Sequence, residues 1–154
     1  MLPLFACRFG VGALEALTPG LQSLTMLTQL NLSFNGIMDS TTPHLAAVLP
    51  YLSCLRSLCL SENEITGAGT LTLTTAVSTL DNLQAIDLSY NPIGDEGAVA
   101  MAELLRVRSS LRSVDVTCAL VGEAGEAALQ SVMSDEDPMR CRHMLDISWP
   151  VCKL

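Results

Sequence analysis

Leucine and other apolar residues recur along the chain with a period of 28 residues. The segment LTQLNLSFNGI begins at Leu27 and returns as LRSLCLSENEI at Leu55, LQAIDLSYNPI at Leu83 and LRSVDVTCALV at Leu111. A fixed period of this size means that one supersecondary unit is repeated, and such units stack because none of them buries its apolar side alone. The pattern therefore predicts a solenoid.

The apolar spacing changes half-way through each copy. Leu58 and Leu60 alternate with polar or small residues, as in a half-buried strand. Later in a copy, Gly97, Met101 and Leu105 follow the spacing of one helix face. Each copy is therefore predicted to be a short strand followed by a helix.

Local helix signals support this assignment unevenly. Asp95 stands before an apolar run and is expected to be an N-cap, and Glu123 is expected to open the next helix in a similar way. The run from Thr70 is rich in β-branched residues, which disfavour a helix. We predict a helix there because the repeat register requires one.

A strand of the form LxxLxLxxN followed by a helix that begins near glycine resembles the leucine-rich repeats of the ribonuclease-inhibitor-like subclass. The resemblance is carried by Leu27, Leu30, Leu32, Asn35, Ile37, Leu55, Leu58, Leu60, Asn63, Ile65, Leu83, Ile86, Leu88, Asn91 and Ile93. It implies an α/β leucine-rich-repeat solenoid, a horseshoe arc with a parallel concave sheet and helices on the convex side.

The register also extends toward both ends of the chain. We expect one domain over 1–154, and LeuAspIleSerTrp from Leu145 is expected to align with IleAspLeuSerTyr from Ile86 if the loop near Asp135 carries three additional residues. The predicted units are a partial repeat 1–26, full repeats 27–54, 55–82, 83–110 and 111–141, and a degraded terminal strand 142–154.

Two columns of repeated residues are interpreted as structural. Asn35, Asn63 and Asn91 can hydrogen-bond backbone groups that a tight inward turn would leave unpaired. Ala119 breaks this column, so an altered or weaker turn is expected there. Gly69, Gly97 and Gly125 share a position at a helix start, where a missing side chain permits close packing.

Composition narrows the function. The chain is 49% hydrophobic but 4% aromatic, so aliphatic residues are expected to fill one core. The formal net charge of -8 argues against nucleic-acid binding, which depends on phosphate contacts. There is no apolar run long enough to span a bilayer and no secretion signal at the start, so we expect a cytoplasmic protein that does not bind membranes.

The cysteines show no CxxC pair and are expected to be reduced thiols: Cys7, Cys54, Cys59, Cys118, Cys141 and Cys152. The cluster of Cys141, His143 and Cys152 lacks the paired spacing of a zinc site, so no metal is expected. The only histidines, His44 and His143, accompany no nucleophile motif, and no phosphate-binding loop follows a strand. We therefore predict a protein that is not an enzyme and has no cofactor.

Residues between the inward-facing leucines are expected to form columns on the concave face. One column reads Pro3, Asn31, Cys59, Asp87, Asp115 and Asp146, and another reads Ala6, Phe34, Glu62, Tyr90, Cys118 and Trp149. Acidic groups beside exposed aromatic rings are typical of protein-binding surfaces. The predicted partner-binding residues are Phe34, Glu62, Asp87, Tyr90, Asp115, Asp146 and Trp149.

A competing interpretation remains open for the aspartates, because LeuAspLeuSer is close to the consensus of the resembled family. Trp149 departs from that consensus and is the better candidate for a binding hot spot. The arginines at Arg106, Arg108 and Arg112 are interpreted as ordinary solvated charge rather than as an anion site.

These observations lead to two functional hypotheses. The first is a non-catalytic interaction or scaffold module that binds a protein with a basic surface. Because neither end of the stack shows a polar cap, it is expected to be a fragment or subunit of a larger assembly, with edge-strand contacts to neighbours. The alternative, implied by the resemblance to Ran GTPase-activating proteins, is a regulator of a small GTPase.

Overall fold

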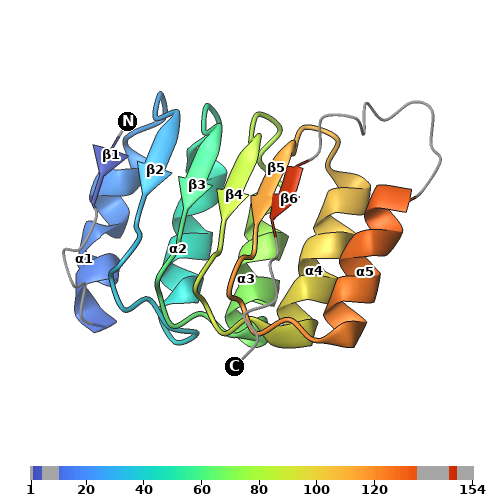
Figure 1. The fold of residues 1–154 in the computed structure, drawn as a ribbon. Helices are drawn as coiled ribbons and strands as arrows, with labels where there is room; N and C mark the ends of the chain where they lie inside the picture. Colours follow the sequence, from blue (N-terminus) through green and yellow to red (C-terminus); the bar gives the residue numbers. More distant parts are fainter. Residues whose placement is uncertain (1, 5–10, 135–145, 149–154) are drawn as a thin grey trace.

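Six parallel strands lie side by side in one sheet, in the order in which they occur in the chain (Figure 1). This is seen in a computed structural model, which describes residues 2–4, 11–134 and 146–148. The strands are β1 (Leu2–Pro3), β2 (Gln29–Asn31), β3 (Ser57–Cys59), β4 (Ala85–Asp87), β5 (Ser113–Asp115) and β6 (Asp146–Ser148).

The register of the first five strands follows the sequence repeat. Leu30 pairs with Leu2 and with Leu58, and Ile86 pairs with Leu58 and with Val114. Equivalent leucine positions are therefore neighbours in space, which confirms the stack of repeats that the 28-residue period predicts.

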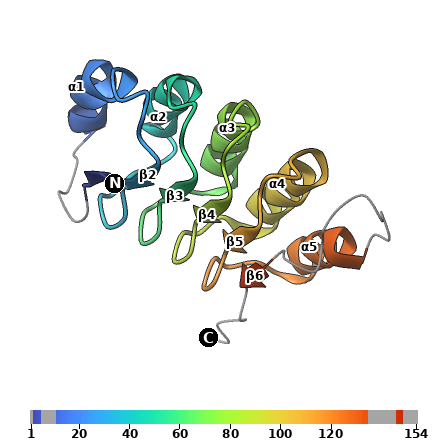
Figure 2. The ribbon, with the colours of Figure 1, turned by 90° about the horizontal axis from the view of Figure 1, so that it is seen from above.

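Helices cover one side of the sheet and connect successive strands. In Figure 2 the strands lie along the inner side of a shallow arc and the helices along its outer side. The helices are α1 (Val11–Gln22), α2 (Thr42–Val48), the short 3-10 helix η1 (Leu49–Tyr51), α3 (Gly67–Val77), α4 (Gly94–Val107) and α5 (Glu123–Ser134). The prediction of an α/β solenoid with a concave parallel sheet is confirmed.

Helix α3 forms despite its content of threonine. The hydroxyl groups of Thr70, Thr72 and Thr75 donate to the carbonyl oxygens four residues earlier, at 2.8 to 3.1 Å. Such bonds to the carbonyl four residues earlier satisfy the hydroxyl groups but slightly destabilise a helix, so they do not offset the low helix propensity of threonine. Packing of Leu73 and Val77, both 3% exposed, supplies the driving force.

The core fills the space between sheet and helices. Leu32, Leu45, Leu60 and Ile65 are at most 1% exposed and belong to one continuous apolar cluster. Side chains from strands β2 to β5 and from the helices therefore depend on neighbouring repeats for burial, as expected of a solenoid.

Asp95 does not take the predicted N-cap position of its own helix. Helix α4 begins at Gly94 with Ile93 as N-cap, so Asp95 lies in the first turn. Its Oδ1 accepts the backbone N–H groups of Gly122 at 2.6 Å and Gly125 at 3.0 Å, at the start of α5. The N-cap prediction was wrong because the carboxylate stabilises the helix of the next repeat.

The last strand pairs in a different register from the one predicted. Ser113 pairs with Asp146 and Asp115 with Ser148, an offset of 33 residues, five more than the 28 of the other pairs. The sequence alignment allowed three additional residues and placed Asp146 beside Asp115. Asp146 is therefore not part of the aspartate column, because pairing of Val114 with Ile147 sets the register.

The thiols are not all in the predicted state. Cys54 and Cys59 are free, as expected. Cys118 is disulfide-bonded, which contradicts the expectation of a reduced thiol at this position. The predicted cluster of Cys141, His143 and Cys152 also lies outside the described residues.

Candidate functional site

The chain leaves each strand through a turn that is held by a buried asparagine. Asn63 Oδ1 accepts the N–H groups of Asn35 and Ile37 in the preceding repeat, both at 3.0 Å. Its Nδ2 donates to Leu32 and Leu60 carbonyl oxygens at 3.1 and 2.8 Å. This bonding confirms the structural interpretation of the asparagine column and fixes the turns next to the concave face.

The turn that lacks this asparagine is built differently. Ile65 N–H donates to Asn91 Oδ1 at 3.1 Å, but the equivalent N–H of Ile93 donates to the backbone carbonyl of Asn91 at 2.8 Å. Ala119 offers no amide and instead accepts the Gly94 N–H through its backbone oxygen at 3.0 Å. The expected alteration at Ala119 is confirmed.

Three predicted binding residues occupy one equivalent corner after their strands. Phe34, Glu62 and Tyr90 have φ angles of 62°, 54° and 55°, in the left-handed region that side chains seldom adopt. All three side chains are exposed, Phe34 by 46% and Tyr90 by 57%. We call these three residues the corner row; it lies at the rim of the concave face rather than on the strands themselves.

Backbone hydrogen bonds hold the corner row in register. Phe34 N–H donates to Ser61 O at 3.1 Å and Tyr90 N–H donates to Thr117 O at 2.8 Å. Glu62 N–H donates to Ser89 O at 2.9 Å in the same manner. The parallel ladder thus continues past the strand ends, and it aligns the three side chains along one line.

The aspartates on the strands are partly engaged within the fold. Asp87 Oδ1 accepts the Ser89 N–H at 3.0 Å and the Ser89 hydroxyl at 2.7 Å, and Asp115 Oδ1 accepts the Thr117 N–H at 2.9 Å. Both side chains are half-buried on the inner face of the arc. These bonds favour a structural role of both carboxylates at the strand ends.

The remaining predicted binding residues stand at the end of the chain. Asp146 begins β6 beside Ser113, and Trp149 lies outside the described residues. The structure therefore brings Phe34, Glu62 and Tyr90 together in one row, with Asp87 and Asp115 on the adjoining strands. A role in binding stays a prediction for all of them.

Cys59 shares the inner face with these aspartates. Its Sγ donates to Asp87 Oδ2 at 3.1 Å and lies 3.3 Å from Ser61 Oγ. Burial, aided by the nearby Asp87 carboxylate, raises the pKa of the Cys59 thiol against the lowering effect of Ser61. A thiol that is kept protonated is a poor nucleophile, so Cys59 is a packing and hydrogen-bonding group here.

Acidic residues gather along the rim that carries the corner row. This rim is formed by residues 33–44, 61–70, 89–98 and 117–126, which follow the strands and begin the helices, and which contain no lysine or arginine. We call it the acidic rim; its carboxylates are Asp39, Glu62, Glu64, Asp95, Glu96, Glu123 and Glu126. Of these seven only Glu62 is predicted from the sequence as a binding residue, because the stacking of the repeats brings the others onto the same rim.

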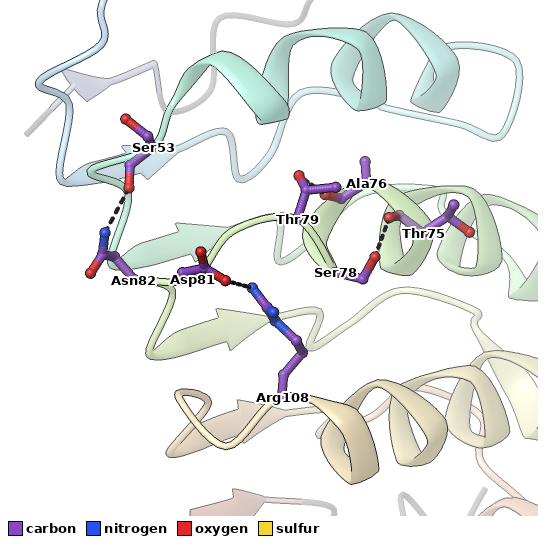
Figure 3. A network of polar contacts seen from close by, with 8 residues as sticks. All are labelled: Ser53, Thr75, Ala76, Ser78, Thr79, Asp81, Asn82 and Arg108. Atoms are coloured by element: carbon purple, nitrogen blue, oxygen red, sulfur yellow. Dashed lines mark hydrogen bonds and ion pairs between the residues drawn. The ribbon is translucent and has the colours of Figure 1, made fainter.

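All arginines of the described residues lie on the opposite rim, where helices end and strands begin: Arg56, Arg106, Arg108 and Arg112. Figure 3 shows this region, where Arg108 makes an ion pair of 2.7 Å with Asp81 and Asn82 donates to Ser53 O at 2.9 Å. Both contacts join neighbouring repeats. Part of the predicted solvated arginine cluster is therefore tied into the fold.

The described part of the chain shows no group of three or more His, Cys, Asp or Glu side chains that could hold a metal ion. None of its helices is both long enough and apolar enough to cross a bilayer. The described surface carries carboxylates and exposed aromatic rings along the rim of the concave face.

Comparison with known proteins agrees with this architecture. A family model described as "Leucine Rich repeat" matches residues 23–40 and 80–102. The chain is similar in structure to a tropomodulin C-terminal domain from Caenorhabditis elegans, with a TM-score of 0.70 and 14% identity over 85% of this chain and 80% of that one.

A second solved structure, described as leiomodin-1 actin-binding site 2, matches with a TM-score of 0.67 and 17% identity over 85% of this chain and 76% of that one. A search of curated protein sequences gives no match.

Proposed function

Because the chain is a leucine-rich-repeat protein, we propose that it is a non-catalytic interaction module that binds a protein partner along the corner row and the adjoining concave strands. The observation that carries this proposal is the row of Phe34, Glu62 and Tyr90, exposed in equivalent left-handed corners. The ladder bonds fix their backbone in advance, so little conformational entropy is lost there on binding.

The composition of the row supports protein binding. Aromatic rings dominate the binding energy of many interfaces because they bury a large area with few rotatable bonds. Tyr90 and Phe34 expose about half of their surface to solvent, although aromatic residues are scarce in this chain. Solvent-exposed rings of this kind gain free energy when a partner covers them.

The charge of the same region supports a partner with a basic surface. Glu62 lies within the row, and the Asp87 and Asp115 carboxylates lie on the strands beside it. Opposite charges across an interface accelerate association and exclude partners of the wrong sign.

The finer features of this function are also proposals. We propose that the protein is cytoplasmic and that it is a fragment or subunit of a larger assembly. In this assembly the end strands β1 and β6 contact neighbouring chains, since the unpaired edge of a strand offers hydrogen-bonding groups. The name of one structural neighbour includes an actin-binding site, so actin belongs among the partners to be tested. The alternative of a GTPase regulator is favoured by none of the contacts described above.

Two tyrosines of nearly equal exposure provide the test. Tyr90 is 57% exposed in the corner row, and Tyr51 is 54% exposed in η1 on the helical side. The chain and its Tyr90→Ala and Tyr51→Ala variants are used to isolate partners from native extract, with crosslinking and mass spectrometry to locate the contacts.

The proposal predicts that Tyr90→Ala loses the captured partner while Tyr51→Ala retains it, and that crosslinks map to the inner face and acidic rim. Equal capture by both variants, or crosslinks confined to the helices, contradicts it.

A further inference from the structure

We propose that the corner row binds an arginine side chain of an extended, basic segment of the partner, with its guanidinium against Glu62 and its plane against Tyr90. This inference rests on the proposed function and names the chemistry of the ligand.

The spacing suits one side chain between two rings. Adjacent parallel strands lie about 4.8 Å apart, so Phe34 and Tyr90, which are two strands apart, stand about 10 Å from each other with Glu62 between them. An extended segment of about three residues spans the same length. A short stretch of partner chain can therefore cross all three corners along the rim.

The choice of arginine follows from the three side chains together. A guanidinium group is planar, so it can stack on an aromatic face while its N–H groups donate to a carboxylate. Glu62 supplies the carboxylate, and Tyr90 and Phe34 supply exposed rings on either side. Lysine can meet the charge of Glu62 but lacks the plane that matches the rings.

The charge of the rim remains negative after the helix dipoles are counted. Helices α2, α3, α4 and α5 begin at this rim, and each helix N-terminus contributes about half a positive charge. Four helices thus offset about two of the carboxylates Asp39, Glu62, Glu64, Asp95, Glu96, Glu123 and Glu126. The remaining excess attracts a cationic segment and repels acidic ones.

The opposite rim sets where the segment lies. Arg56 and Arg112 are exposed where β3 and β5 begin, at the other end of the strands. A basic segment that ran down the strands would meet these arginines, whereas one that follows the acidic rim across the repeats avoids them. The polarity of the two rims therefore favours a path along the corner row.

The test uses the full chain, isotope-labelled for NMR, and a blocked Gly-Arg-Gly-Arg-Gly peptide as the probe. We expect amide shifts centred on Phe34, Glu62 and Tyr90, and weaker binding of the same peptide with lysine. A peptide with glutamate in place of arginine is expected not to bind.

Two charge-reversal variants distinguish a local contact of the peptide with Glu62 from an effect of the net charge of the protein. Glu62→Lys replaces an attraction by a repulsion at the row and is expected to weaken binding about tenfold, since an exposed ion pair contributes modestly. Glu103→Lys changes the net charge equally on α4, outside the acidic rim, and is expected to weaken binding less than about twofold.

Equal losses in the two variants, shifts away from the row, or equal binding of the glutamate peptide would overturn this inference. The proposed function is judged separately. If Tyr90→Ala abolishes partner capture while the arginine peptide fails to bind, the interaction module stands and the arginine assignment is wrong. If Tyr90→Ala leaves capture intact, the proposed function itself fails.

Discussion

The side-chain oxygen of Asn63 accepts a hydrogen bond from the backbone N–H of Asn35, one repeat earlier, at 3.0 Å. The same side chain also accepts from Ile37 and donates to Leu32 and Leu60 carbonyl oxygens. A single buried amide thus satisfies backbone groups of two neighbouring repeats, which couples their stability.

Replacing this amide is expected to be costly. Asn63→Ala leaves two buried N–H groups and several carbonyl oxygens without the partner, so we predict a loss of about 3 kcal/mol in the free energy of unfolding. Within the described residues Asn35 Oδ1 accepts no hydrogen bond, so Asn35→Ala is expected to cost about 1 kcal/mol less. Urea denaturation measures both.

A surface asparagine serves as the control. Asn82 is exposed and donates one hydrogen bond to Ser53 O, so Asn82→Ala is expected to cost less than about 1 kcal/mol. A loss at Asn63 no greater than that at Asn82 would show that the asparagine column does not couple the repeats.

Leu120 holds a backbone conformation that leucine disfavours. Its φ is 55° and its side chain is 63% exposed, while Gly36 has a φ of 64° at the same position of an earlier repeat. Relief of left-handed strain exceeds the entropy cost of glycine, so Leu120→Gly is expected to stabilise the fold by about 0.5 kcal/mol. Gly36→Ala is expected to destabilise it by about 1 kcal/mol.

Thermal melts of the two variants check this pair of predictions. Changes of opposite sign are required, and a Leu120→Gly variant that melts below the parent would contradict the strain argument.

Asp95 is predicted to stabilise the helix of the repeat that follows it. Removal of its carboxylate in Asp95→Ala leaves the N–H groups of Gly122 and Gly125 without their acceptor, at a cost of about 1 kcal/mol. A Cβ at Gly125 would stand 2.8 Å from Asp95 Oδ1, so glycine permits this contact. Hydrogen exchange in α5 should accelerate more than in α4.

The neighbouring Glu96 provides the matched control. It lies in the same first turn of α4 and is exposed, so Glu96→Ala removes an equal charge without removing this cap. Equal acceleration of exchange in both variants would mean that charge alone is responsible.

Cys59 is predicted to react slowly with alkylating reagents. Burial raises the pKa of its thiol, and the Asp87 carboxylate raises it further, so less thiolate is present at mildly alkaline pH. Asp87→Asn is expected to speed alkylation several-fold, and Ser61→Ala to slow it, because the Ser61 hydrogen bonds lower the pKa. Mass spectrometry in a Cys54→Ser background follows the rate against pH.

The prediction is tested by whether each substitution raises or lowers the rate of Cys59 alkylation. A rate that is unchanged or lowered in Asp87→Asn would show that access to the thiol, and not its pKa, controls the reaction.

The sequence predicts which residues share the corner row, but not where the row lies. The sequence identified Phe34, Glu62 and Tyr90 as an exposed column, because their spacing of 28 residues puts them at one position of the repeat. It placed them on the concave strands, whereas they lie at left-handed corners beyond the strand ends. Side-chain periodicity reports which residues share a position, but not the φ angle of the turn that presents them.

Two contacts between repeats were not predicted from the sequence. The helix that Asp95 caps lies about one repeat beyond it, and helix-start rules consider only nearby residues. The predicted register of β6 was wrong because the alternating pattern of this segment allows either Asp146 or Ser148 to lie beside Asp115. The pairing of Ile147 with Val114 selects Ser148.

The sequence by itself determined the repeat, the strands and helices and the buried positions, since a periodic apolar pattern records which side of each unit must leave water. Only the tertiary structure decided the partner of each polar group, the corner that displays Tyr90, and the separation of carboxylates and arginines onto opposite rims. Hydrogen bonds and charge neighbours across a solenoid join residues one repeat apart. Their geometry exists only after the repeats have stacked.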